Sequence, residues 1–220
     1  MSDEGAGGVP ERGAALAEIV LATHNAHKVE EFQRIIGEAL PGVTVLPYDG
    51  PEPVEDGLSF SENALIKARA AAAHTGRIAL ADDSGICVDV LGGAPGIFSA
   101  RWAGPGHGDQ ANLELLLAQL RDIAPSDRGA RFECHIAIVV PGIDGTPEHE
   151  TVAVGVWPGS LATEPGGEGG FGYDPIFIPE GGARTAAELS AEEKNTSSHR
   201  ARAVADAIPR LSMILTARDE

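Results

Sequence analysis

Residues 81–85, Ala-Asp-Asp-Ser-Gly, place two carboxylates, a hydroxyl and a glycine directly after the apolar residues 78–80. The apolar residues are typical of a short buried strand, so the polar ones are expected where that strand ends. Mg2+ is commonly held by one or two carboxylates, with substrate phosphates and waters completing its octahedral shell. The same five residues are typical of a solvated turn, because they form local hydrogen bonds there. The pentapeptide alone favours the turn over a magnesium site, and the segments that reverse this preference lie elsewhere in the chain.

A second candidate is the polar loop that joins an expected strand over residues 19–22 to an expected helix over residues 28–40. A helix N-terminus favours an anion, and a lysine adds a point charge. The Gly-x-x-x-x-Gly-Lys spacing of a Walker loop is absent, and an ordinary connection with an Asn cap explains the loop equally well. The loop consists of Thr23, His24, Asn25, Ala26, His27 and Lys28.

A third candidate is glycine-rich: five glycines occupy the seven positions 166–172 and lead into Tyr173 and Asp174. Such backbone can approach a ligand closely, and Phe171 offers a ring face on which a base could stack. A flexible linker is the alternative, although a linker rarely ends in Phe, Tyr and Asp-Pro.

The basic residues are also informative, because 13 of the 16 are arginines and three are lysines. Lys28 ends the polar loop, Lys67 lies on a helix expected from Ser59 to His74, and Lys194 lies on a short helical turn. His199 and Arg200 fall in the first turn of the last helix, where a positive charge opposes the helix dipole. That placement indicates a nearby anion.

The composition restricts the class of protein. A net charge of −17 argues against a nucleic-acid or anionic-membrane surface and favours a small-molecule partner. Residues 1–17 lack the features of a secretory signal and are expected to be a disordered extension of a single domain over residues 18–220. Cys87 and Cys134 stand singly in apolar runs, as in a cytoplasmic protein with reduced thiols. No apolar stretch reaches membrane-spanning length.

The order of the expected elements indicates the fold. Strands and helices alternate in the first half, and residues 131–140 and 150–157 then form a long hairpin. This order predicts an α/β protein with a mixed sheet and an antiparallel lobe. Residues 47–57 form an irregular acidic loop that carries Glu55, and Asp109 is expected to cap a further helix.

Together these segments resemble the inosine triphosphate pyrophosphatase family, and the resemblance extends from Ile19 to about Leu215. The similar pieces occur in the family's order: residues 23–28, residues 60–64 with Lys67, residues 81–89, residues 92–102, residues 171–175, Lys194 and residues 198–200. His24 is a departure, since the family often has a small residue there. All three lysines fall inside these pieces, as charges facing a polyphosphate would require.

The resemblance implies an elongated α/β fold of two lobes with the nucleotide in a central cleft, and it implies assembly as a homodimer. It implies Mg2+-dependent hydrolysis of ITP, dITP or XTP to the monophosphate and pyrophosphate. By resemblance Asp83 is the general base and, with Glu55, a metal ligand, while Asp82 ranks second. The resemblance assigns the following residues to the substrate: Thr23, His24, Asn25, Ala26, His27, Lys28, Lys67, Ser84, Phe171, Gly172, Tyr173, Asp174, Lys194, His199 and Arg200.

Two other functions are compatible with much of this pattern. A non-catalytic nucleotide-binding module could use the same cleft, although a sensor does not need Asp83 and Glu55. A Maf-type pyrophosphatase has a similar general architecture, but residues 171–175 and 199–200 favour the inosine triphosphate family.

Overall fold

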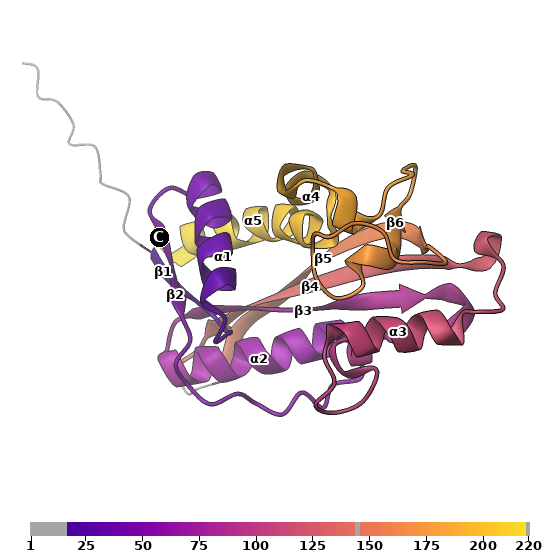
Figure 1. The fold of residues 1–220 in the computed structure, drawn as a ribbon. Helices are drawn as coiled ribbons and strands as arrows, with labels where there is room; N and C mark the ends of the chain where they lie inside the picture. Colours follow the sequence, from indigo (N-terminus) through magenta and orange to yellow (C-terminus); the bar gives the residue numbers. More distant parts are fainter. Residues whose placement is uncertain (1–16, 144–145, 219–220) are drawn as a thin grey trace, which may run out of the picture.

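The computed structural model describes residues 17–143 and 146–218, apart from the side chain of His27. These residues form one six-stranded mixed sheet in the order β2-β1-β3-β4-β5-β6 (Figure 1). Strand β1 is parallel to both of its neighbours, β2 and β3, and the remaining neighbours are antiparallel. The strands are β1 (Ala17–Leu21), β2 (Val43–Pro47), β3 (Ile78–Val88), β4 (Gly129–Pro141), β5 (Pro147–Leu161) and β6 (Phe177–Pro179).

Helices cover both faces of the sheet. The helices are α1 (Ala26–Ala39), α2 (Phe60–Thr75), α3 (Asp109–Gln119), α4 (Ala191–Ser197) and α5 (His199–Arg218), with short 3-10 turns between them. Figure 1 shows α1 and α5 on one side of the long strands and α2 and α3 on the other. The predicted mixed α/β sheet with flanking helices is therefore confirmed. None of the described helices is long and apolar enough to cross a membrane.

The core has separate clusters along the sheet. Apolar residues of β1 to β5 pack against α1 and α5 on one face, and an alanine-rich cluster packs against α2 on the other. A further cluster, which includes Ile86, Leu116, Trp157 and Phe177, joins the far ends of the long strands to α3 and β6.

The expectation that a strand ends at residue 81 is wrong. Strand β3 continues to Val88, because β4 pairs with it in antiparallel register from Ala79↔Val139 to Val88↔Ala130. This ladder gives the backbone of the Asp-Asp-Ser-Gly segment partners that a turn would not supply. The parallel neighbour β1 stops at Leu21, opposite Leu80. Beyond that point the β1 side of β3 is open to the loop that precedes α1.

Helix α2 is fixed at both ends by local contacts. The Ser59 hydroxyl accepts a hydrogen bond from the Glu62 N–H, as predicted, while the Glu62 carboxylate accepts from Leu58 instead of closing the expected capping box. Gly76 ends the helix in the left-handed region, with φ at 65°. The small buried faces of Ala64 and Ala68 let α2 lie close to the sheet, which sets how far its polar side chains reach.

Helix α5 lies equally close to β5. A Cβ added at Gly155 would collide with the backbone of His199 and Ala203, so this position requires glycine. The helix continues through Pro209 to Arg218 as one element. The close approach at Gly155 brings the first turn of α5, with His199 and Arg200, down onto the sheet.

Candidate functional site

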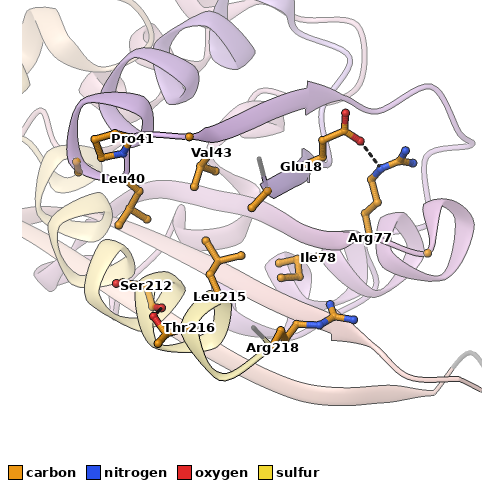
Figure 2. A pocket seen from close by; sticks show the side chains of 14 residues that line it. Glu18, Leu40, Pro41, Val43, Arg77, Ile78, Ser212, Leu215, Thr216 and Arg218 are labelled. Carbon is orange, nitrogen blue, oxygen red and sulfur yellow. Dashed lines mark hydrogen bonds and ion pairs between the residues drawn. The ribbon is translucent and has the colours of Figure 1, made fainter. Parts of the chain in front are cut away.

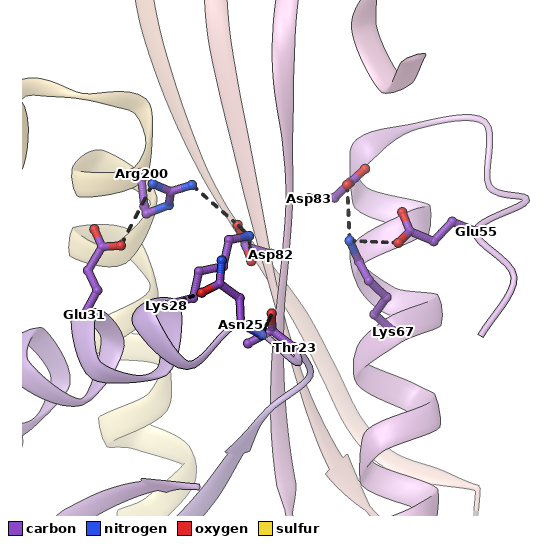
Figure 3. A network of polar contacts seen from close by, with 9 residues as sticks. All are labelled: Thr23, Asn25, Lys28, Glu31, Glu55, Lys67, Asp82, Asp83 and Arg200. Carbon is purple, nitrogen blue, oxygen red and sulfur yellow. Dashed lines mark hydrogen bonds and ion pairs between the residues drawn. The ribbon is translucent and has the colours of Figure 1, made fainter. Parts of the chain in front are cut away.

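Asp82 and Asp83 point to opposite faces of β3, because successive side chains of a strand alternate. Figure 3 shows Asp82 facing Lys28 and Arg200 on the α1 and α5 side, and Asp83 facing Lys67 and Glu55 on the α2 side. The candidate site is therefore two polar clusters joined through one strand.

On the first face, Asp82 is 4% exposed and binds Lys28 through both carboxylate oxygens at 3.0 Å. The Arg200 guanidinium lies 4.0 Å from the same carboxylate and 4.0 Å from Glu31. Burial alone would raise the pKa of Asp82, but Lys28 and Arg200 outweigh burial and hold it below its ordinary value. Asp82 is thus a buried ionised anchor for two cations.

On the second face, Lys67 lies between two carboxylates. Its Nζ atom is 3.2 Å from Asp83 and 3.4 Å from Glu55. The pKa of Asp83 is raised, because burial outweighs the opposing effect of Lys67. The pKa of Lys67 is raised as well: burial lowers it, but Asp83 and Glu55 prevail. A carboxylate with a raised pKa takes up a proton more readily than an exposed one.

Asn63 belongs to this cluster, although it was not predicted as a site residue. Its side-chain amide donates to Asp83 at 3.3 Å, and its carbonyl oxygen accepts from the Gly57 N–H at 3.0 Å. Asn63 therefore links Asp83 to the acidic loop that carries Glu55. Its spacing of four residues from Lys67, which places both on one helix face, is the signal that could have identified it.

The second cluster fits a divalent cation. Glu55 and Asp83 already converge on one positive charge, the Lys67 ammonium, and carboxylate oxygens are the ligands that Mg2+ prefers. Within residues 17–143 and 146–218 no three His, Cys, Asp or Glu side chains gather closely enough to form a complete metal site. The two carboxylates thus fit an ion that takes its other ligands from substrate and water.

The polar loop before α1 lies at the open edge of β3, between the two clusters (Figure 3). Helix α1 begins at Ala26, and the side chain of Asn25 accepts from the Lys28 N–H at 3.3 Å as an N-terminal cap. Thr23 accepts from the Asn25 N–H at 3.2 Å. The loop thus combines a helix N-terminus with the Lys28 ammonium, the combination predicted for an anion.

His24 contacts the acidic loop. One ring nitrogen lies 3.0 Å from the Gly50 carbonyl, the other lies 3.2 Å from Glu52, and the ring stacks on Tyr48. The side chain of His27 lies outside the described residues. A hollow of about 70 Å3 lies beside this contact and is lined by Ala22, Thr23, His24, Tyr48, Glu52, Pro53, Glu55 and Lys67.

The glycine-rich turn only partly matches its prediction. Phe171 is 64% exposed, so its ring is free to stack on a base. The N–H groups of Phe171 and Gly172 already donate to Asp174 and Asp109, so these two amides are paired within the protein. Asp109 was expected to cap α3, but Gly108 takes that position, because the Asp109 carboxylate is held by Gly172.

Tyr173 and Asp174 point into the protein. The buried Tyr173 hydroxyl donates to the Ser99 carbonyl at 2.8 Å, so the structure does not bring Tyr173 to the candidate site. Asp174 is buried and binds Lys194 at 2.6 Å. This ion pair attaches α4 to the glycine-rich turn and holds the third lysine beside Phe171.

The first turn of α5 supplies two unpaired polar atoms. Among the described residues, His199 Nδ1 and Arg200 Nε are the buried side-chain nitrogens and oxygens without a hydrogen-bond partner. His199 stacks on Phe132, and burial together with Arg200 lowers its pKa to about 3. Ser84 lies on the same strand face as Asp82. A buried neutral imidazole and an unused guanidinium N–H are suited to a polar ligand.

A larger cavity, of about 460 Å3, lies at the opposite end of β1 (Figure 2). Its lining includes Leu40, Val43, Ile78, Leu215 and the Glu18–Arg77 ion pair. None of the predicted site residues lines this cavity, so we do not assign the candidate site to it although it is the larger of the two hollows.

Comparison with known proteins gives consistent matches over most of the chain. Residues 19–210 match the Ham1 family. A dITP/XTP pyrophosphatase of Leifsonia xyli subsp. xyli is 62% identical over 196 residues, which are 88% of this chain and 95% of the relative. A dITP/XTP pyrophosphatase of Streptomyces coelicolor is 53% identical over 199 residues, with 88% and 96% of the two chains covered.

Solved structures agree with these matches. A HAM1 protein from Coxiella burnetii superimposes with a TM-score of 0.78 at 43% identity, covering 91% of this chain and 99% of that one. A nucleoside-triphosphatase / dITP/XTP pyrophosphatase from Mycobacterium abscessus gives a TM-score of 0.73 at 46% identity, covering 87% and 99%.

Asp82→Asn should destabilise the protein by about 3 kcal/mol near neutral pH, because it leaves Lys28 and Arg200 without their buried counter-charge. The folded-state pKa of Asp82 is lowered, so its stabilisation is present above the unfolded pKa and is lost as the pH falls through the folded pKa. The difference between variant and wild type should therefore shrink in acid. Urea unfolding at a series of pH values measures it.

The matched control is Glu38→Gln, which removes the partner of Arg34 in an exposed i,i+4 pair. It should change stability by no more than about 0.5 kcal/mol at any pH. Equal losses for Asp82→Asn and Glu38→Gln would contradict a special role for the buried anchor.

Proposed function

This chain belongs to the Ham1 family, and from that premise we propose that it hydrolyses noncanonical purine nucleoside triphosphates, namely dITP, ITP and XTP, to the monophosphate and pyrophosphate. It is a hydrolase acting on nucleoside triphosphates. The observation that carries the proposal is the Asp83 cluster: a carboxylate with a raised pKa beside Lys67 and Glu55, at the open edge of β3.

We propose Asp83 as the general base. One oxygen of its carboxylate is oriented by Lys67 and the other by Asn63, and its raised pKa suits the removal of a proton from an attacking water. Enzymes of this family generally depend on a divalent metal ion. We propose Mg2+, held by Asp83 and Glu55, which supplies Lewis-acid polarisation of a phosphate when bound.

The chain's own cations are proposed to meet the triphosphate. Lys28 and the N-terminus of α1 face the open edge of β3 from one side, and Lys67 from the other (Figure 3). Asp82 and Asp83 hold these two ammonium groups in place before substrate arrives. Such preorganised charge needs no rearrangement when negative charge develops on the leaving pyrophosphate.

The purine base is proposed to lie between Phe171 and the first turn of α5. Phe171 presents an exposed ring, while His199 Nδ1 and Arg200 Nε are buried and unpaired. Hypoxanthine and xanthine carry an acceptor oxygen at C6, where adenine carries an amino donor, so the Arg200 N–H pairs with the first two and not with the third. Lys194 is proposed to stabilise the turn that carries Phe171.

The non-catalytic alternative is disfavoured, because a sensor needs neither the Asp83 base nor a pair of metal-binding carboxylates. The family match is to Ham1 proteins, as the resemblance predicted, rather than to the Maf type. A single two-lobed domain over residues 18–220, a disordered extension over residues 1–17, a homodimer and a cytoplasmic location stay proposals. Residues 1–16 lie outside the described part of the chain.

Pyrophosphate release from a nucleotide panel with Mg2+ tests the proposed function. The purified protein should release pyrophosphate and the monophosphate from dITP, ITP and XTP, and much more slowly from ATP and GTP. Omitting Mg2+ should abolish release. Absence of release from all three noncanonical nucleotides would contradict the proposal.

Asp83→Asn should lower kcat by roughly two to four orders of magnitude, the usual scale for loss of a general base. The substitution is nearly isosteric, so the melting temperature should change little. Asp122→Asn, at an exposed position outside the site, is the control and should keep wild-type turnover. Near-normal turnover of Asp83→Asn at saturating Mg2+ would mean that another carboxylate is the general base.

Measurements of base selectivity should distinguish the role of Phe171 from the roles of His199 and Arg200 on α5. Phe171→Ala should weaken binding of all nucleotides similarly, because every base offers a face for stacking. Arg200→Ala or His199→Ala should narrow the ratio of kcat/KM for ITP over ATP, because adenine carries an amino donor at C6 where hypoxanthine carries an acceptor. Hydrogen-bonded sites reject a wrong analogue by about four to five orders of magnitude, so this ratio has room to fall.

Melting temperatures check that the three variants fold, since His199 packs on Phe132. The assignment of base reading to α5 is wrong if Phe171→Ala strongly lowers the ratio of kcat/KM for ITP over ATP while the His199 and Arg200 variants leave that ratio unchanged.

A further inference from the structure

A chain of polar side chains adjoins the Asp83 cluster without being part of it. The Ser61 hydroxyl lies 2.7 Å from His135 Nδ1, and His135 Nε2 lies 3.2 Å from the Glu133 carboxylate. The other oxygen of Glu133 accepts from Arg131 at 2.7 Å. His135 and Glu133 are only 13% and 17% exposed, so these contacts are largely shielded from water.

The partners of His135 determine the direction of its hydrogen bonds. An ionised Glu133 carboxylate can only accept, so His135 Nε2 must carry a hydrogen. In the neutral ring Nδ1 then accepts, and the Ser61 hydroxyl donates to it. Although burial acts in the opposite direction, the bonds from His135 and Arg131 keep the pKa of Glu133 below its ordinary value. The hydrogen bonds therefore run from Ser61 through His135 to Glu133, which also accepts from Arg131 on its other side.

His135 is the direct cross-strand partner of Asp83 in the β3–β4 ladder. Directly opposed residues of an antiparallel pair point to the same face, with Cβ atoms about 4.5–5.5 Å apart. His135 thus stands beside the proposed base on the face that α2 covers. The site described above does not account for this arrangement of Ser61, His135 and Glu133.

The other end of the chain lies in the first turn of α2. Ser61 belongs to that turn, and the neighbouring Phe60 ring packs against the His135 ring at 5.5 Å between centroids. Asn63 and Lys67, which both hydrogen-bond Asp83, follow on the same helix. The position of this turn against β4 consequently decides where the two donors meet the Asp83 carboxylate.

We propose that His135 is a positioning residue for hydrolysis: through Ser61 it fixes the first turn of α2 on β4 and so aims Asn63 and Lys67 at Asp83. The inference rests on the proposed function, since it concerns the orientation of the base. This role acts through Ser61 and α2 and requires no contact between His135 and the reacting atoms. Small misplacements of a catalytic group reduce rate steeply, so loss of this contact lowers kcat more than it raises KM.

The test uses the full chain with ITP and Mg2+. His135→Ala and Ser61→Ala should each lower kcat by about 10- to 100-fold, with KM changed by no more than about threefold. The double variant should be no worse than either single one, because both remove the same link. His135→Asn should recover most of the lost kcat, since an Asn amide reaches the place of Nδ1 and can still accept from Ser61.

Thr75→Ala is the matched control at the opposite end of α2, where the hydroxyl donates to the Ala71 carbonyl. It should lower the melting temperature while leaving kcat unchanged. The proposal is overturned if His135→Ala lowers kcat no more than Thr75→Ala does, or if the effects of Ser61→Ala and His135→Ala simply multiply.

Nuclear magnetic resonance separates failure of this proposal from failure of the proposed function. The ring nitrogen shifts of His135 should report an Nε2–H tautomer that changes in Ser61→Ala, and the carboxyl carbon shift of Asp83 should move in His135→Ala but not in Thr75→Ala. A wild-type protein without pyrophosphatase activity contradicts the proposed function, and these shifts still decide the positioning role. Unmoved shifts contradict the positioning role whatever the activity.

Discussion

The alternation of side chains along β3 is the constraint on which the rest of the site depends. Because β4 keeps β3 extended through residues 82–84, Asp82 and Asp83 cannot face the same way. Because β1 ends at Leu21, the loop before α1 can reach that segment from the side. One strand thus delivers two carboxylates to two helical layers, and each layer supplies its own lysine.

The two helical layers shift the pKa values of two neighbouring aspartates in opposite directions. Asp82 is nearly inaccessible, yet Lys28 and Arg200 hold its pKa low. Asp83 has one neighbouring lysine, shared with Glu55, and its pKa is raised. The difference arises from the number of cations per carboxylate rather than from burial, since the more buried residue is the more acidic one. A buried ionised anchor and the proposed proton acceptor therefore lie one residue apart.

Local patterns predicted the elements better than their contacts. The start of α2 at Ser59, the short helical turn that carries Lys194 and the β4–β5 hairpin are specified by neighbouring residues, and the structure has each of them. The continuation of β3 was missed because its cause, pairing with β4, lies about 50 residues away in the sequence. His135 was missed for the same reason, because its place opposite Asp83 depends on the β3–β4 pairing. Asn63 was missed although its spacing of four residues from Lys67 was a usable local signal. Tyr173 was assigned to the site from its motif, but its hydroxyl is used inside the fold.

The rarity of lysine has a consequence for chemical modification. Lys28, Lys67 and Lys194 each bind a carboxylate in or beside the proposed site, and the other 13 basic residues are arginines, which do not react with common acylating reagents. Both cysteines are buried and offer no alternative attachment point. Besides the α-amino group, an amine-directed label or cross-linker can therefore react only with these three lysines. Each such reaction would remove a positive charge in or beside the proposed site. Lysine coupling modifies many surface positions on most proteins, whereas on this protein it would be directed to the proposed site.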